Sequence, residues 1–206
     1  MTTNPLPDQS FALEDEDAAR AEVYTLLAHL FYAPPSAELL AHLRAAPEAE
    51  LESALAPSWN ALLGVARDLD VAAISAEYDT LFGGVGKPDV YLFGSHYLSG
   101  FLNEKPLVQL RDDLAKLGLA RAPAMPETED HIAYLCDAMR LLITRPEADG
   151  SSLALQREFY LAHIRPWADD LHDAIVAQPA ARFYARLAEF FRDFNSVEAQ
   201  AFDMLS

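Results

Sequence analysis

A glycine-rich, aromatic stretch, "LFGGVGKPDVYLFGSHYLSG" at residues 81–100, is the first candidate for chemistry because it contains a Gly-Lys pair. A P-loop cradles phosphates with the pattern G-x-x-x-x-G-K-[ST]. With Gly86 and Lys87 as that pair, the first glycine of the pattern would be Leu81, and the hydroxyl residue would be Pro88. The spacing of a dinucleotide-binding loop fails as well. The sequence therefore predicts a structural loop or a binding lip, and no nucleotide site.

Metal ligation and covalent catalysis are also poorly supported by the spacing of the available side chains. The chain has no H-E-x-x-H and no C-x-x-C pattern, and His163, Asp169 and His172 do not fall on one helix face. Cys136 lies in an apolar helical run, and Ser95 is not part of a G-x-S-x-G elbow. We therefore expect no metal, no cofactor and no nucleophilic catalysis.

Asp130 and His131 place an acid beside a base at the predicted start of an apolar helix, on the flank away from its apolar stripe. Asp130, Tyr134 and Asp137 then share one face at i, i+4 and i+7, and Glu127 precedes His131 by one turn. One interpretation is a capped helix start with a solvated face, and a second is an acidic rim that receives a cation. A small helical hydrolase using Asp130 and His131 is a third, although adjacent helical side chains point about 100° apart.

The charge balance restricts the class of partner. The chain has 206 residues, with 15 Lys and Arg against 32 Asp and Glu, which gives a net charge of −17. This balance argues against nucleic acid, whose phosphates require clustered cations, and it favours a cationic partner or simply high solubility. One cysteine, no signal-peptide pattern and no apolar run of about 18 residues predict a cytoplasmic protein without membrane insertion.

Helical periodicity, interrupted by Pro and Gly, predicts the elements that must position these residues. We expect a flexible tail at residues 1–13 and one all-α domain at 14–206, a helical bundle of about nine to ten helices. The predicted helices span about residues 14–33, 36–46, 57–69, 71–82, 106–117, 128–143, 152–165, 166–177, 179–194 and 196–205. Thr128 is the expected cap of the helix that follows it, and Gly83 is expected at the C′ position of the helix that precedes it.

Aromatic residues gather around the glycine-rich loop: Tyr78, Phe82, Tyr91, Phe93 and Tyr97. Tyr78, Leu81 and Phe82 share one helix face, which is the usual pattern of a core stripe. The other three lie in or beside a loop, where aromatic side chains more often meet ligands.

Three ordered segments resemble the TorD/DmsD/NarJ family of redox-enzyme maturation chaperones. "EYDTLFGG" resembles its Y-x-x-L-F segment, and "MPETEDHIAYLCDAMRLLI" resembles its E-x-D-H helix, with Glu127 or Glu129, then Asp130 and His131, at the matching positions. "QREFYLAHIRPWADDLHDAI" is similar to its C-terminal H-x-x-P-W segment, so the resemblance covers about residues 18–195. "FGS" at 93–95 is the best match to a short aromatic-Gly-Ser element of the family.

The resemblance implies an all-helical, non-enzymatic, cytoplasmic chaperone. Its partner would be the catalytic subunit of a molybdenum-containing oxidoreductase, whose twin-arginine leader peptide it binds, delaying export until the cofactor is inserted. The implied peptide-binding residues are Tyr78, Leu81, Phe82, Tyr91, Ser95, Tyr97, Glu127, Glu129, Asp130, His131 and Tyr134. The alternative is a chaperone that acts on the mature apoenzyme without binding a leader. We expect a monomer, with segment exchange through residues 118–128 as the route to a domain-swapped dimer.

Overall fold

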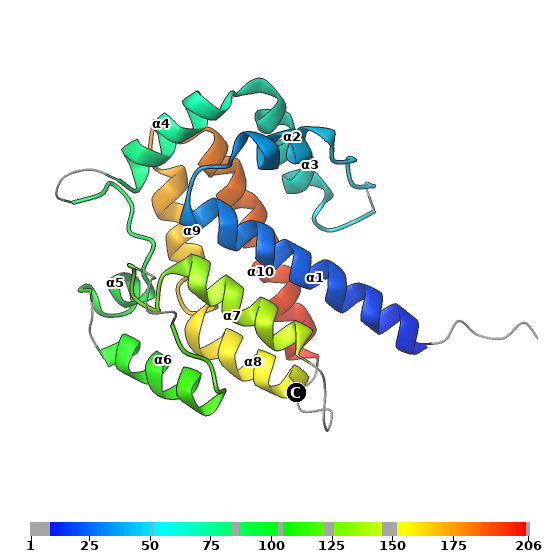
Figure 1. Cartoon of the computed structure of the whole chain (residues 1–206), viewed down its shortest axis with the longest axis vertical. Helices are drawn as coiled ribbons and strands as arrows, with labels where there is room; N and C mark the ends of the chain where they lie inside the picture. The colour runs from blue at the N-terminus through cyan, green and yellow to red at the C-terminus, as the bar shows by residue number, and fades with distance from the viewer. Residues whose placement is uncertain are drawn as a thin grey trace, which may run out of the picture.

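Ten α-helices and one isolated β-bridge form the secondary structure of the described residues (Figure 1). The structure, a computed structural model, describes residues 9–50, 52–83, 87–102, 105–121, 126–145 and 152–204, and for residues 9–15 the backbone only. The helices are α1 (Gln9–Tyr32), α2 (Ala37–Ala45), α3 (Ala56–Asp68), α4 (Val71–Leu81), α5 (Gly94–Ser99), α6 (Lys105–Lys116), α7 (Ile132–Thr144), α8 (Ser152–His163), α9 (Ala168–Val176) and α10 (Phe183–Asp203). The all-α prediction is confirmed.

The core forms where α1 lies along α7 and where aromatic side chains of α1 meet those of α10, so that segments distant from α1 in the sequence pack on it (Figure 1). Helix α10 also packs on α3, α4 and α9, and α7 packs on α8. Edge-to-face aromatic pairs join the two long helices, with ring centroids 4.9 Å apart for Tyr24 and Phe194 and 5.5 Å apart for Phe31 and Phe191. No helix in the described ranges has both the length and the apolar character that crossing a bilayer requires.

A buried ion pair fastens α1 to the C-terminal half of α10. The carboxylate of Glu198 accepts hydrogen bonds from Nε of Arg20 at 2.7 Å, from Nη2 of the same residue at 2.9 Å and from the hydroxyl of Tyr24 at 2.9 Å. Glu198 is almost fully buried. We call these three residues the α1–α10 clamp.

A second buried carboxylate, Glu77 of α4, caps the start of α10. Its two oxygens accept hydrogen bonds from the backbone amides of Arg182, Phe183 and Tyr184 at 2.8, 3.1 and 2.8 Å. The first amides of a helix have no partner within the helix and carry partial positive charge, so a carboxylate is well suited to them. Glu77 therefore fixes α4, and with it Tyr78 and Phe82, against α10.

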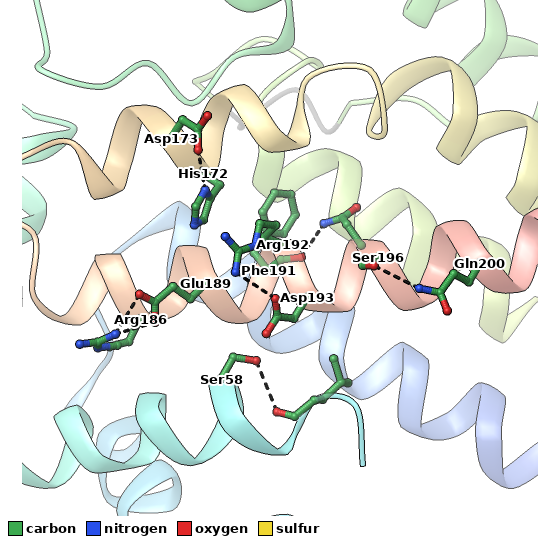
Figure 2. A network of polar contacts seen from close by, with 12 residues as sticks. Ser58, His172, Asp173, Arg186, Glu189, Phe191, Arg192, Asp193, Ser196 and Gln200 are labelled. Carbon is green, nitrogen blue, oxygen red and sulfur yellow. Dashed lines mark hydrogen bonds and ion pairs between the residues drawn. The ribbon is translucent and has the colours of Figure 1, made fainter. Parts of the chain in front are cut away.

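On the polar side of α9 and α10, side chains that are near neighbours in the sequence form hydrogen bonds and ion pairs (Figure 2). Arg186 pairs with Glu189 at 2.7 Å, and Arg192 pairs with Asp193 at 3.3 Å. These exposed pairs contribute little to stability. They do engage Arg186 and Arg192 of α10.

Several helix boundaries differ from the sequence predictions. Helix α1 begins at Gln9, inside the segment predicted to be a tail, and residues 1–8 lie outside the described part. Helix α5 was not predicted. The predicted helices 179–194 and 196–205 are one continuous helix, because nothing between them interrupts the hydrogen bonding and buried Asn195 donates from its side chain to the carbonyl of Phe191. Prolines do not begin α9 and α10, which start two and four residues after Pro166 and Pro179.

Gly83 follows the C-cap of α4, as predicted, but it does not adopt the left-handed conformation expected at C′. Position 83 requires glycine for a steric reason, because a Cβ atom there would lie 2.8 Å from the carbonyl oxygen of Asp79. Gly84 and Gly86 lie outside the described residues.

Candidate functional site

The segment that follows the glycine-rich loop is joined to the segment that precedes α7. Phe93 and His131 form an isolated antiparallel bridge. The backbone amides of Gly94 and Ile132 each donate a 2.9 Å hydrogen bond across it, to the carbonyls of residues 130 and 92. Two of the segments singled out in the sequence are therefore in direct contact.

Asp130 completes this connection with its side chain. One carboxylate oxygen accepts a 2.9 Å hydrogen bond from the backbone amide of Ser95, and the other accepts a 2.6 Å hydrogen bond from the hydroxyl of Thr128. The residue is 3% exposed. The prediction that Asp130 projects from the first turn of a helix into a solvated acidic rim is therefore wrong. Its carboxylate thus accepts a hydrogen bond from a backbone amide at the start of α5 and links that short helix to the segment before α7.

His131, and not Thr128 as predicted, is the N-cap of α7. Its Nδ1 accepts a 3.2 Å hydrogen bond from the amide of Ala133, which requires the neutral tautomer with the proton on Nε2. Burial lowers the pKa of His131 to about 4, against the opposing effect of the Asp130 charge. The acid and the base of this pair thus both have structural partners, and neither side chain lies on the solvated face that the sequence predicted.

The third motif, around Trp167, packs against the same place. The indole Nε1 donates a 2.7 Å hydrogen bond to the carbonyl of His163. Tyr97 stacks on the indole, with ring centroids 5.3 Å apart, and donates its hydroxyl to the carbonyl of Tyr91 at 2.7 Å. A Cβ atom on Gly94 would lie 3.0 Å from the indole nitrogen, so the backbone at Gly94 approaches the side chain of Trp167 as closely as glycine allows. We call residues 91–97, 128–131 and 163–167 together the motif junction.

A cavity of about 220 Å³ opens beside the motif junction, between α5, α6 and α8. Ser95, Asp130, His163 and Trp167 line it together with the start of α6. Nε2 of His163 lies 3.1 Å from a carboxylate oxygen of Asp113, which ties α8 to α6.

A cluster of tyrosines lies next to His131, near the ends of α1 and α4 and the start of α7. The hydroxyl of Tyr78 donates to the carbonyl of Tyr32 at 2.7 Å, and the rings of Tyr32 and Tyr134 are 5.9 Å apart. Burial, followed by the charge of Glu127, raises the pKa of Tyr78 to about 12. Glu127 therefore places its carboxylate near this cluster, and within the described part of the chain it forms no ion pair. We call these four residues the tyrosine cluster.

Glu129, in contrast, is already neutralised. Its carboxylate lies 2.8 Å from a guanidinium nitrogen of Arg111 and 3.6 Å from one of Arg121. Burial alone would raise the pKa of Glu129, but the hydrogen bond with Arg111 holds that pKa below its ordinary value. Glu127 is thus the acid of the "ETEDH" segment that is free to receive a cation from outside.

The predicted site residues separate into two groups. Leu81, Ser95, Asp130 and His131 are buried and do not form a surface. The remaining predicted residues are half-buried: Tyr78, Phe82, Tyr91, Tyr97, Glu127, Glu129 and Tyr134. Sequence reasoning missed Tyr32, His163 and Trp167 as site residues, although the H-x-x-x-W spacing was available as a signal for the last two.

The chain is similar to proteins of known family. The model of the nitrate reductase delta subunit family matches residues 48–173. The chaperone protein TorD of Aliivibrio fischeri is 26% identical over 88% of this chain and 93% of its own length. TorD of Aliivibrio salmonicida is 28% identical over 62% of this chain and 63% of its own length.

A solved structure has the same fold. A redox enzyme maturation protein from Archaeoglobus fulgidus superposes with a TM-score of 0.59 at 17% identity, over 86% of this chain and 93% of that one. The matched family segment contains the whole of the motif junction. The chain therefore belongs to the nitrate reductase delta subunit family, as a redox-enzyme maturation chaperone of the TorD type.

Proposed function

We propose that this chaperone acts in the cytoplasm on the apo form of a molybdenum-containing oxidoreductase, and that it binds the twin-arginine leader peptide of that enzyme. Binding the leader would delay export until the cofactor is inserted. The observation that carries the proposal is the convergence of three distant segments at the motif junction, next to the tyrosine cluster, whose member Glu127 forms no ion pair among the described residues.

The tyrosine cluster is suited to an arginine of the leader. A guanidinium that pairs with Glu127 would also lie close to the rings of Tyr32 and Tyr134, and cations are attracted to the faces of aromatic rings. Asp130 and His131 would act indirectly, by holding the loop at residues 91–97 in place. Their roles are then those of positioning residues.

The relative magnitudes indicate which contacts supply affinity. Exposed ion pairs contribute about 0–1 kcal/mol each and are screened over about 8 Å at physiological salt. Burying three or four apolar leader side chains yields roughly 5–10 kcal/mol before ordering costs of several kcal/mol. Apolar contacts with Phe82, Tyr91 and Tyr97 therefore supply most of the affinity, and Glu127 supplies selectivity and association rate.

A titration with a labelled twin-arginine leader, beside the same peptide with both arginines replaced by lysine, tests the proposal. We expect saturable binding at micromolar affinity or tighter, weaker for the lysine peptide. Tyr97→Ala and Phe82→Ala should each weaken binding about tenfold or more, and Glu127→Gln about threefold at low salt. Glu158→Gln, an exposed acid of α8, is the matched control and should change nothing.

Failure of every leader to bind would redirect the proposal to the mature apoenzyme. In that case the same variants are tested for capture of the apoenzyme lacking its leader. Unchanged leader affinity in both Tyr97→Ala and Phe82→Ala would remove the motif junction and the end of α4 as the leader site.

A further inference from the structure

An apolar groove of about 470 Å³ runs between α1, α2 and the start of α3, on a part of the molecule that the motif junction does not include. Val23 and Leu26 of α1, Leu39 of α2, and Leu55 and Trp59 at α3 line it, and all five are only half-buried. Five large apolar side chains that remain partly exposed in one groove are more than the isolated apolar residues that any surface carries.

The groove exists because α1 carries two apolar stripes. Tyr24, Leu27 and Phe31 form the stripe that is buried against α7 and α10. Val23 and Leu26 belong to a second stripe, which begins at Ala19 and includes only one charged residue, Glu22. A helix at the surface of a globular protein requires one apolar stripe for its core.

Helix α2 faces the same groove with a matching stripe. Leu39 and Leu43 of α2, with Ala46 as its C-cap, recur at i, i+4 and i+7 and all line it. Two helices thus present apolar faces to a space that no described side chain fills. A groove of this kind, between two helices, has the form that receives an amphipathic helix in helix-in-groove recognition.

The rim of the groove is acidic. Glu22 lines it directly, and Glu50 and Glu52 are exposed neighbours of the lining residues Ala49 and Ser53. Within the described ranges none of these three acids forms an ion pair.

The cations closest in the chain are already engaged. Arg67 pairs with Glu48 at 2.7 Å, and Arg44 donates to the carbonyls of Ala66 and Leu69 at 2.9 and 2.7 Å. On α10, whose Phe190 lines the groove, Arg186 is held by Glu189 (Figure 2). His42, an exposed residue of α2, also lines the groove. The groove is therefore mostly apolar, and its rim carries three carboxylates without an ion pair in the described ranges.

We propose that this groove binds a cationic amphipathic helix of a partner protein, with the apolar face of the helix on Leu26, Leu39 and Trp59 and its basic residues at the acidic rim. A second copy of the chain is disfavoured as the occupant, because each copy carries a net charge of −17. The site is separate from the motif junction, so the inference does not depend on leader binding. A chaperone with two such sites would hold two segments of a client at once, which raises the overall affinity through effective concentration.

The two tryptophans of the chain allow the two sites to be observed separately. Trp59 lines the groove and donates its indole N–H to the carbonyl of Pro47 at 3.1 Å, whereas Trp167 is buried at the motif junction. The probe is a synthetic 18-residue helix with leucine on one face and lysine on the other, and the matched control peptide carries glutamate in place of lysine. We expect the lysine peptide to shift the tryptophan emission of the wild-type protein and to leave that of Trp59→Phe unchanged.

Substitutions in the groove then locate the contact. Leu26→Glu and Leu39→Glu should each lower the affinity for the lysine peptide at least tenfold. Val197→Glu, at an exposed valine of α10, should leave that affinity unchanged. Equal affinity for Leu26→Glu and the wild type would overturn the proposal. Circular dichroism confirms that each variant is folded. If the leucine variants do not fold, the charge reversals Glu22→Lys and Glu52→Lys decide the question, with a three- to tenfold weakening expected at low salt.

Two controls separate this groove from simpler explanations. The reversal Glu158→Lys, on α8, measures non-specific attraction to an acidic protein, and a loss equal to that of Glu22→Lys would overturn the proposal. A twin-arginine leader at saturating concentration should not displace the lysine peptide. Displacement would show that one surface serves both peptides and would overturn the assignment of a separate partner helix.

Discussion

The α1–α10 clamp and the motif junction both bury a carboxylate where distant parts of the chain meet, but they satisfy it with different chemistry. Glu198 in the clamp is held by the guanidinium of Arg20 and the hydroxyl of Tyr24. Asp130 at the motif junction forms no ion pair with a described residue and is held by the backbone amide of Ser95 and the hydroxyl of Thr128. The first joins two long helices, and the second joins two loops.

This difference separates stability from function. Removing one member of a buried ion pair leaves an uncompensated charge, which is among the most destabilising changes in a protein interior. Removing a hydrogen bond that orders a loop costs less, but it releases the side chains that the loop carries. The clamp should therefore control whether the chain folds, and the motif junction should control what the folded chain binds.

Arg20→Met is the strongest test of this separation. It leaves the carboxylate of Glu198 buried beside Tyr24 alone, so we expect the free energy of unfolding to fall by about 3–5 kcal/mol in a urea titration. Asp17, the half-exposed second partner of Arg20, provides the control, because Asp17→Asn should cost less than about 1 kcal/mol. Leader affinity of the folded Arg20→Met protein should equal that of the wild type, and a weaker affinity would break the comparison.

The pH dependence of stability tests the burial of His131. Because its pKa is lowered to about 4 in the folded protein, the unfolded chain binds a proton at a higher pH than the folded chain does. Stability should therefore fall as the pH drops from the ordinary histidine pKa of about 6.5 to about 4, by about 3 kcal/mol in total. His131→Asn keeps a capping side chain and removes the titration. The stability difference between wild type and His131→Asn, measured by urea unfolding from pH 7 to pH 4, should shift against the wild type. A constant difference would show that His131 is not held neutral.

Asp130→Asn changes the motif junction with almost no change in shape. The amide has a single oxygen acceptor, so either the amide of Ser95 or the hydroxyl of Thr128 loses its partner, at a cost of about 1–3 kcal/mol. Hydrogen exchange at the Ser95 amide should accelerate, and leader affinity should fall by more than it does in Arg20→Met. Thr128→Ala, which removes one hydrogen bond of the carboxylate and leaves the other, should give an intermediate effect.

Sequence reasoning was accurate where local patterns determine the structure. Apolar periodicity with Pro and Gly at its ends predicted nine of the described helices at least in part, and it predicted the buried stripe of α7 that contains Cys136 and Met139. It missed α5, because six residues carry no periodicity and because the carboxylate that its first turn contacts lies 35 residues away in the sequence. It also divided α10 in two, because a polar Asn-Ser pair resembles a boundary when its burial is unknown.

At the candidate site, too, features set by local sequence were predicted and features set by long-range contacts were not. The residue types that gather at the motif junction were predicted from their resemblance to family segments, but their orientation was not. Asp130 and His131 were expected to face solvent because helix geometry was extended one turn too far, to residues that in fact precede α7. The pairing of Phe93 with His131 is a long-range contact that no local pattern encodes. Tyr32 joins the site for the same reason, through contacts with Tyr78 and Tyr134.

Two glycine substitutions of similar expected cost give the finest test of the comparison. At Gly94 an added Cβ would lie 3.0 Å from the buried indole of Trp167, so Gly94→Ala must displace the ring or the loop, at a cost of about 1 kcal/mol. At Gly100 the added Cβ would meet nothing within 4 Å, but the residue has a φ of +78°, so Gly100→Ala costs about 1–2 kcal/mol through backbone strain alone. Thermal unfolding should therefore show comparable losses of stability in Gly94→Ala and Gly100→Ala. Only Gly94→Ala should shift the fluorescence emission of Trp167, recorded in a Trp59→Phe background, and only this variant should lower the affinity for the leader peptide. Equal effects of the two variants on leader affinity would mean that the peptide surface responds to stability in general, and not to the contact between the loop and Trp167.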